Sequence, residues 1–208
     1  MSRTAERILK GVLHLLFITP FVALLAGAFM GKLGANPVEV LTHETGEWAL
    51  RLLILVLMVT PLRKLTGWNW MVRQRRMIGL YGFFYVVCHL TTYVWLDQFF
   101  DLETIFEDIV KRPYITVGFS AFLLLIPLAA TSNNAMVKRL GARRWRALHR
   151  AAYVAALLGV VHFLWLVKAD LREPLVYASV LGVFLCARLP WRTMLDKRKA
   201  NALKSASN

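Results

Sequence analysis

The sequence predicts an all-α membrane protein built from six transmembrane helices. Hydrophobic residues make up 58% of the 208 residues and charged residues 18%, whereas soluble globular chains average about 45–50% and about 25%. The apolar residues occur in six separate blocks, and the segments between the blocks are alternately basic and acidic. Because six spans use almost the whole chain, any chemistry is expected inside the membrane or at its surface.

Each of the six apolar runs reaches or approaches the length of about 17–25 residues that crosses a hydrocarbon core about 30 Å thick. The runs are 12–31, 48–62, 77–96, 114–131, 151–167 and 174–191. The first contains Pro20, which is expected to kink it. The second contains Arg51, which is expected to extend to the lipid headgroups. We therefore expect one membrane domain over residues 1–195, followed by a basic cytoplasmic tail at 196–208.

The basic residues are distributed unevenly about these spans. Of 26, 20 precede the first span or follow the second, fourth or sixth, so that they share one side. Acidic residues dominate the other side: Glu39, Glu44, Glu47, Asp97, Asp101, Glu103, Glu107, Asp108, Asp170 and Glu173. Since basic residues favour the cytoplasmic side, both termini are expected in the cytoplasm of a bacterium, with the acidic loops outside its inner membrane. This alternation explains the net charge of +14 and argues against nucleic-acid binding.

The amino-terminal segment has an alternative interpretation as a secretory signal, because it has a basic start, an apolar stretch and Ala26-Gly27-Ala28 as a candidate cleavage site. Its apolar run of 20 residues exceeds the usual about 7–15, which favours a retained helix. Cys88 and Cys186 both fall inside predicted spans and are too few for a disulfide framework. The chain has no C-x-x-C-H motif, so covalent attachment of a c-type haem is excluded.

Two connecting segments have recognisable character. Residues 97–112 form the longest outer loop, which is amphipathic and acidic and ends at Pro113, where the next span begins. This loop is the expected docking surface for an outer partner. Residues 135–148 are predicted to form one basic cytoplasmic helix, with Trp145 near the membrane surface. His43, in the outer segment after the first span, is expected to be a surface or partner-contact residue.

Two of the five histidines are predicted to lie at the same depth. His89 is 12 residues from the inner edge of the third span, and His162 is 11 residues from that of the fifth. At about 1.5 Å per residue, their rings lie about 18 Å and about 16.5 Å above the inner surface. Ionisable residues inside a membrane are costly and therefore functional candidates. One such histidine alone could equally make an interhelical hydrogen bond, but a level pair of neutral imidazoles favours bis-histidine ligation of haem b.

The residues around this pair are compatible with a flat macrocycle. Tyr85 and Tyr93 lie four residues to either side of His89 and share its slowly drifting stripe. Gly159 precedes His162 by three residues. A small residue lets a ring approach the helix backbone, although it equally lets two helices approach each other. Tyr85 and Gly159 are therefore candidates for cofactor contacts.

The inner end of the bundle offers a second, less defined site. His149 lies 13 residues before His162 and points about 140° away from it on a straight helix. Near its depth the third span carries Arg75 and Arg76, whose guanidinium groups suit phosphates or haem propionates. His14 of the first span lies at roughly the right depth to act as a partner. Three alternatives stay open: a second haem, a pocket for a flavin phosphate and a quinone, or simple surface residues.

Motifs that follow one another along nearly the whole chain carry a family resemblance. They are LKGVLHLLFITPF (9–21), NPVEVLTHETGEWAL (36–50), TPLR (60–63), RRMIGLYGFFYVVCHLTTY (75–93), KRPYITVG (111–118), TSN (131–133), LGARRWRALHRAAY (140–153) and HFLW (162–165). Together these motifs resemble the MsrQ (formerly YedZ) family of haem-binding membrane subunits, which belongs to the ferric-reductase-like transmembrane family.

The resemblance implies that electrons from the quinone pool, or from a cytoplasmic flavin reductase, cross the membrane by way of FMN and haem b. They would reach the periplasmic molybdopterin enzyme MsrP, which reduces oxidised methionines in envelope proteins and would carry the substrate chemistry. The resemblance also implies that His89, His149 and His162 are haem histidines. The sequence departs from the wider ferric-reductase pattern at Arg75 and Arg76, where a second histidine of the third span would stand, and this argues against a symmetric pair of haems.

Two other functions are compatible with the hydropathy. A stand-alone transmembrane ferric reductase would have the same architecture, but the sequence encodes no soluble nucleotide-binding domain of the kind that such enzymes usually append. A non-redox transporter or assembly factor would leave the level pair of histidines unexplained.

Overall fold

The computed structural model describes residues 2–167 and 169–188, and every regular element within these residues is a helix, as the composition predicted. The predicted tail at 196–208 and the part of the predicted sixth span beyond residue 188 lie outside the described residues. In chain order the elements are α1 (Arg3–Phe29), α2 (Pro37–Thr66), α3 (Trp70–Thr91), the π-helix η1 (Thr92–Asp97), α4 (Leu102–Lys111), α5 (Pro113–Ala130), α6 (Asn134–Leu140), α7 (Ala142–Leu148), α8 (Ala151–Leu166) and α9 (Arg172–Cys186).

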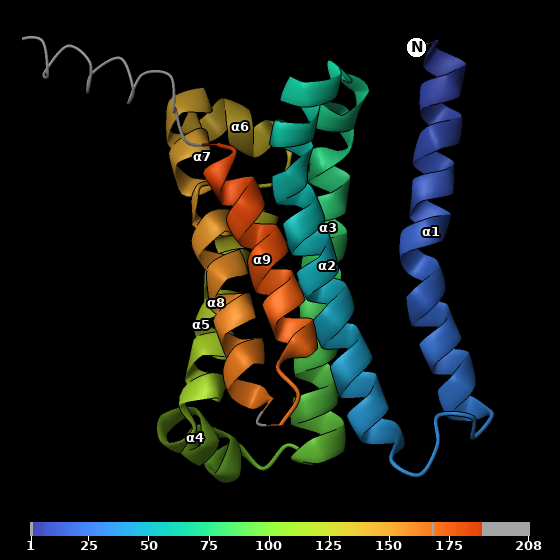
Figure 1. Ribbon diagram of the computed structural model, residues 1–208, viewed down its shortest axis with the longest axis vertical. Coiled ribbons are helices and arrows are strands. Elements are labelled where there is room, and N and C mark those ends of the chain that lie inside the picture. Colours follow the sequence, from blue (N-terminus) through green and yellow to red (C-terminus); the bar gives the residue numbers. More distant parts are fainter. Residues whose placement is uncertain (1, 168, 189–208) are drawn as a thin grey trace, which may run out of the picture.

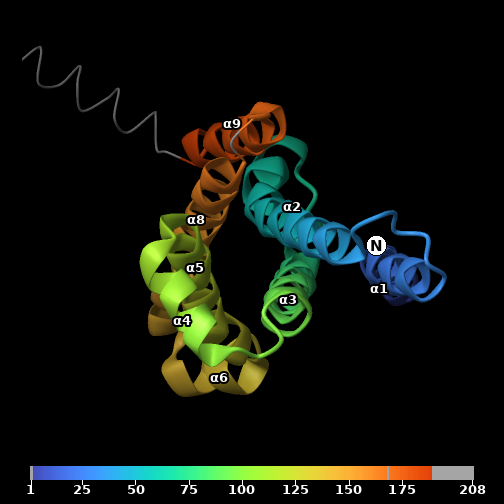
Figure 2. The same ribbon diagram turned by 90° about the horizontal axis from the view of Figure 1, so that it is seen from below.

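The long helices α1, α2, α3, α5, α8 and α9 run along the molecule in alternating directions (Figure 1). The helices α2 and α3 pack as one pair, α5 and α8 as a second, and α9 contacts both α2 and α8. Seen from below, α1 stands outside this bundle beside α2 (Figure 2). The first described residue and the end of α9 therefore lie at the same end of the molecule, whereas α4 covers the opposite end (Figure 1).

The chain is a membrane protein by the character of its helices. Within the residues that the structure describes, four segments are long and apolar enough to span a bilayer: Thr4–Phe29, Trp70–Asp97, Pro113–Ala130 and Ala142–Leu166. The other two predicted spans differ from these. The helix α2 lies at the centre of the bundle, with buried residues along much of its length, and α9 is described over only 15 residues.

Local signals in the sequence explain several helix boundaries. The helices α2 and α5 begin at prolines, Pro37 and Pro113. Proline lacks a backbone N–H, and in the first turn of a helix that group has no partner within the helix. The carboxylate of Asp101 accepts hydrogen bonds from the backbone N–H groups of Glu103 and Thr104 and so caps α4. The helix predicted over 135–148 is instead two short helices. The break falls at Gly141, whose φ of 75° is readily adopted only by glycine.

The helix α1, which stands outside the bundle, is held to it by hydrogen bonds next to Pro20. The hydroxyl of Tyr85 donates to the carbonyl of Phe17 at 2.7 Å and accepts from the N–H of Phe21 at 3.1 Å. In a regular helix those two backbone groups would pair with each other, and Pro20 lies between them. Tyr85 thus inserts its hydroxyl into the helix at the kink. Its side chain is fully buried there, and it is not among the residues that line the cavity described below, so its contact with a cofactor stays a prediction.

We expect Tyr85→Phe to lower the free energy of unfolding by about 1–3 kcal/mol, because both backbone groups of α1 would lose their partner in a buried place. Tyr81→Phe is the matched control, since its hydroxyl bonds His14 at 2.9 Å on an exposed side of the same two helices. Unfolding of both variants is measured by denaturant titration in detergent micelles. Equal losses in the two variants would contradict this account of the kink.

Candidate functional site

A cavity of about 430 Å³ lies between the α2–α3 pair and the α5–α8 pair, and η1 and α4 also contribute to its lining. Its volume falls within the about 300–1,000 Å³ of typical ligand sites. The walls are mostly apolar, with Leu50, Leu53, Phe119 and Phe163 among them. Such a cavity suits a largely apolar ligand of cofactor size.

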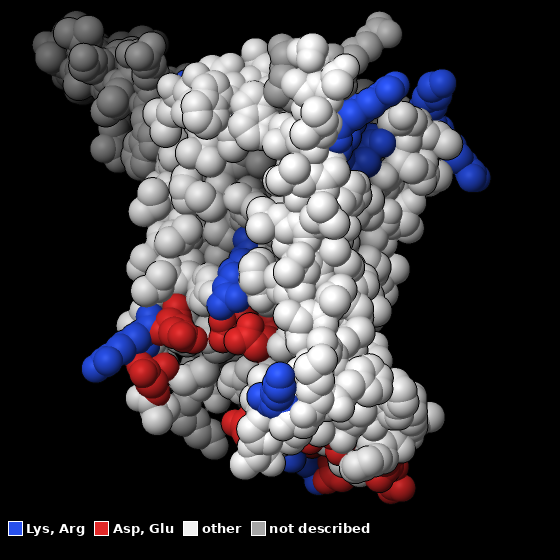
Figure 3. All heavy atoms as spheres, turned by 90° about the vertical axis from the view of Figure 1, so that its right-hand side faces the viewer, with Lys and Arg blue, Asp and Glu red and all other residues white. Residues whose placement is uncertain are grey.

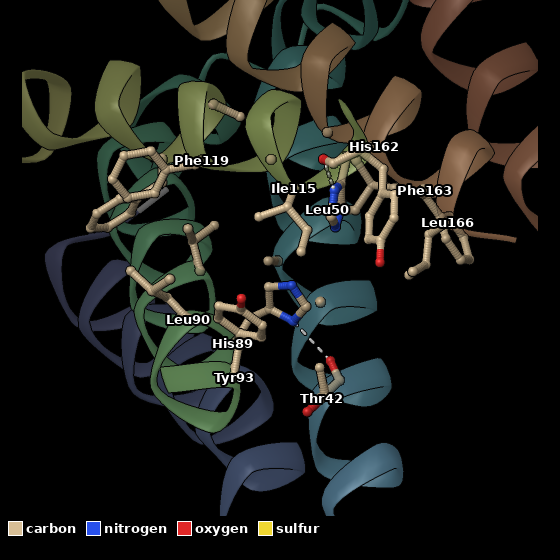
Figure 4. A pocket seen from close by; sticks show the side chains of 18 of the residues that line it. Thr42, Leu50, His89, Leu90, Tyr93, Ile115, Phe119, His162, Phe163 and Leu166 are labelled. Carbon is tan, nitrogen blue, oxygen red and sulfur yellow. Dashed lines mark hydrogen bonds between the residues drawn. The ribbon is translucent and has the colours of Figure 1, made fainter. Parts of the chain in front are cut away.

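The cavity contains the two histidines that the sequence predicted at one depth. Figure 4 shows His89 from α3 and His162 from α8 projecting toward the same space. Their ring centroids are 6.1 Å apart, and their planes are nearly perpendicular at 78°. Two imidazoles bound to one metal by nitrogens about 2.0–2.1 Å from it would have centroids about 6 Å apart. The observed separation therefore leaves room for one metal ion between the rings.

Backbone carbonyls determine which nitrogen of each ring faces the cavity. The Nδ1 atom of His89 lies 2.9 Å from the carbonyl oxygen of Thr42 (Figure 4), and that of His162 lies 2.7 Å from the carbonyl oxygen of Tyr114. A carbonyl can only accept, so each neutral ring carries its hydrogen on Nδ1. Each Nε2 then keeps the lone pair that binds a metal.

Two glycines that sequence reasoning missed lie against these rings. A Cβ atom on Gly46 would lie 3.0 Å from Nδ1 of His89, and one on Gly118 would lie 2.7 Å from Nδ1 of His162. Both contacts are too close for an unaltered ring position. No signal in the sequence marked them. Each glycine stands four residues after a residue whose carbonyl binds an imidazole, and only the structure shows that relation.

A buried carboxylate lies at the end of the cavity where α4 contributes to the lining. Asp108 of α4 accepts from the hydroxyl of Tyr93 at 2.9 Å and pairs with Nε of Arg112 at 2.9 Å, while only 5% of its surface is exposed. Tyr93 and Arg112 both line the cavity. These two contacts hold α4, the helical part of the predicted loop 97–112, over the cavity.

Arg51 corrects an expectation from the sequence. Instead of extending freely to headgroups, its guanidinium pairs with Glu47, donates to the hydroxyl of Tyr177 at 2.9 Å and lies over the ring of Trp48 at 5.1 Å. The charge is therefore neutralised within the protein, which reduces the cost of placing it beside apolar helices. Glu47 also lines the cavity, so this pair borders the candidate site.

The residues of the predicted inner site lie away from the cavity. His149 stacks on Trp145 with centroids 3.9 Å apart, and its Nε2 lies 3.0 Å from the hydroxyl of Thr131. That hydroxyl donates to the carbonyl of Pro127, so it accepts from His149, whose hydrogen is then on Nε2. His149 thus has the opposite tautomer from the cavity pair, and its Nε2 is not available to a metal in this arrangement.

Of the other residues predicted for the two sites, only Gly159 lines the cavity, and Arg75, Arg76 and His14 do not. Arg76 donates to the side chain of Asn134 at 2.8 Å, and neither it nor Arg75 lines the cavity. His14 bonds Tyr81 on the far side of α3, and α1 and α7 lie on opposite sides of the bundle (Figure 1). The structure therefore does not bring His14 to His149. Gly159 does line the cavity, where a Cβ would meet the side chain of Leu50 at 3.4 Å.

Comparison with known proteins gives consistent results. Residues 45–160 match the family described as ferric reductase like transmembrane component. Among curated proteins, a relative from Herminiimonas arsenicoxydans is 47% identical over 97% of this chain and 93% of its own length. A relative from Azospira oryzae is 51% identical over 90% of this chain and 81% of its own length. A relative from Rhodospirillum rubrum is 57% identical over 76% of this chain and 76% of its own length. All three bear the name protein-methionine-sulfoxide reductase heme-binding subunit MsrQ.

We expect Asp108→Ala to loosen α4, because the hydroxyl of Tyr93 and the guanidinium of Arg112 would both lose their acceptor. Hydrogen–deuterium exchange of the α4 amides should rise about tenfold, the equivalent of about 1.4 kcal/mol. Glu107→Ala is the control, since this exposed neighbour pairs with the exposed Lys111. Unchanged exchange in the Asp108 variant would show that the buried carboxylate does not hold the helix.

Proposed function

This chain belongs to the ferric-reductase-like transmembrane family and, within it, to the MsrQ proteins, and we propose that it is the haem-binding electron-transfer subunit of a methionine sulfoxide reductase system. The observation that carries the proposal is the pair of imidazoles 6.1 Å apart in one apolar cavity. The relatives' names supply the class of cofactor and the type of system.

The donor set of the cavity fits haem b. His89 and His162 would hold the iron through Nε2, because both Nδ1 atoms are directed to backbone carbonyls. Haem b, when bound, supplies a one-electron carrier whose potential depends on its axial ligands and surroundings. The apolar walls exclude water from this place, and Gly159 gives a flat ring access to the α8 backbone.

The proposed orientation has six spans with both termini in the cytoplasm of a bacterium, and residues 1–195 as one domain in the inner membrane. Two features support it. The long helices alternate in direction and end on the side where the chain begins (Figure 1). On the face shown in Figure 3, acidic side chains gather in the lower half and at the end where α4 lies. The distribution of basic residues in the sequence favours the opposite end as cytoplasmic.

Electrons would enter at the cytoplasmic end, from a quinone or a cytoplasmic flavin reductase. The tautomer of His149 argues against a second haem ligated there through its Nε2. Arg75 and Arg76, which lie close enough to His149 to act on it electrostatically, suit an anionic group such as the phosphate of FMN. The flavin itself stays a prediction from the family resemblance.

Electrons would leave at the outer end, toward a partner that reduces methionine sulfoxide. The sequence resemblance points to the periplasmic molybdoenzyme MsrP, in a heterodimer with this chain. Glu103 and Glu107 are exposed on α4, the helix that also lines the cavity through Ile105 and Ile109. Their negative charge supports α4 as the docking surface for this partner.

We expect His89→Ala and His162→Ala each to abolish haem binding, because either change removes one of the two imidazoles that would hold the iron. The purified wild type should show the b-type absorption bands after reduction with dithionite, and the variants should lose them. His43→Ala is the control, since His43 also lines the cavity but is not one of the two paired rings. A haem-free wild type would refute the proposed function, and full haem content in both variants would refute the ligand assignment.

We expect the wild type to co-purify with a periplasmic molybdoenzyme and to reduce it. A Glu103→Lys, Glu107→Lys double variant should lower the rate constant of that reduction about tenfold or more at low ionic strength, with less effect at high salt. A Glu39→Lys variant, which changes an acidic residue on α2 instead, serves as the control. Electron transfer from the protein to soluble ferric chelates, in the absence of any such partner, would instead favour the stand-alone metal reductase.

A further inference from the structure

The two halves of the cavity repeat the same arrangement. On α2, the carbonyl of Thr42 bonds His89 from α3, and Gly46 stands one helical turn later beside the same ring. On α5, the carbonyl of Tyr114 bonds His162 from α8, and Gly118 again stands four residues later. In each case one helix of a packed pair supplies the imidazole, and its neighbour supplies both the acceptor and the glycine.

The missing side chain allows the ring edge to lie directly on the neighbouring helix. A Cβ at Gly118 would lie 2.7, 3.0 and 3.1 Å from Nδ1, Cε1 and Cγ of His162. One at Gly46 would lie 3.0 and 3.1 Å from Nδ1 and Cε1 of His89. Carbon atoms normally approach no closer than about 3.5 Å. An alanine at either position would therefore push the ring away from the carbonyl that holds it.

Among the described residues, no other glycine of the long helices lies against an imidazole. A Cβ at Gly27 of α1 would also be close to a neighbour, 2.7 Å from Cδ2 of Leu33, but that side chain belongs to the turn that follows the same helix. A Cβ at Gly79 of α3 would meet only the side chain of Val56, at 3.8 Å, and one at Gly182 of α9 would meet nothing within 4 Å. The close contacts at Gly46 and Gly118 are thus not a general effect of tight helix packing. They occur where an imidazole approaches a backbone carbonyl.

We propose that Gly46 and Gly118 are positioning residues that set the direction and the donor strength of the two cavity imidazoles. The inference rests on the proposed function, because it concerns imidazoles that bind haem iron. A hydrogen bond from Nδ1 to a carbonyl orients the ring and makes Nε2 a stronger donor. A stronger donor stabilises the ferric state, so the two glycines hold the reduction potential of the site low.

The test is Gly46→Ala and Gly118→Ala in the full-length protein, with haem content, redox titration and electron paramagnetic resonance of the oxidised form. Each change should raise the midpoint potential and alter the low-spin ferric signal. Gly118→Ala should have the larger effect, because its added methyl group would be closer to the ring. Alanine is a better helix former than glycine, so weaker helices would not explain these changes.

Gly79→Ala and Gly182→Ala are the matched controls and should keep the wild-type potential and signal. Loss of haem from a folded Gly118→Ala protein, with haem retained in both controls, would also support the proposal, and Gly46→Ala provides the milder variant. A wild-type potential and signal in both Gly46→Ala and Gly118→Ala would overturn it. That result is distinct from failure of the proposed function, in which the wild type itself would contain no haem.

Discussion

The hydrogen bonds from two imidazoles to two backbone carbonyls are the interactions on which the site depends. They assign the hydrogen of His89 and His162 to Nδ1, and so turn both Nε2 lone pairs toward one space. The bonds also join α3 to α2 and α8 to α5, so the helix pairs of the bundle and the geometry of the cavity have a common origin.

Two ionisable groups near the apolar cavity are neutralised within the protein. Arg51 pairs with Glu47, and Asp108 pairs with Arg112 and also accepts a hydrogen bond from Tyr93. Because unpaired charge is costly beside lipid, these pairs let α2 and α4 carry ionisable residues close to an apolar cavity. A low-dielectric site with paired charges at its rim suits a group that changes its own charge by one electron.

The inner and outer histidines illustrate how the same residue type acquires different roles. His149 donates from Nε2 to the hydroxyl of Thr131 and stacks on Trp145, an arrangement that orders the turn between α7 and α8. The cavity histidines donate from Nδ1 to carbonyls and keep Nε2 for a ligand. The tautomer, which the neighbouring acceptor selects, therefore determines which ring nitrogen is left for a ligand.

The sequence by itself determined the all-helical class and the common depth of His89 and His162, because hydropathy and rise per residue are properties of one segment at a time. The tertiary structure alone decided which way side chains face. It turned Tyr85 to the kink of α1, paired Arg51 within the protein and placed Gly46 and Gly118 against the imidazoles. These outcomes depend on which helix lies beside which and at what rotation. That information comes from packing between segments far apart in the chain, and no local pattern contains it.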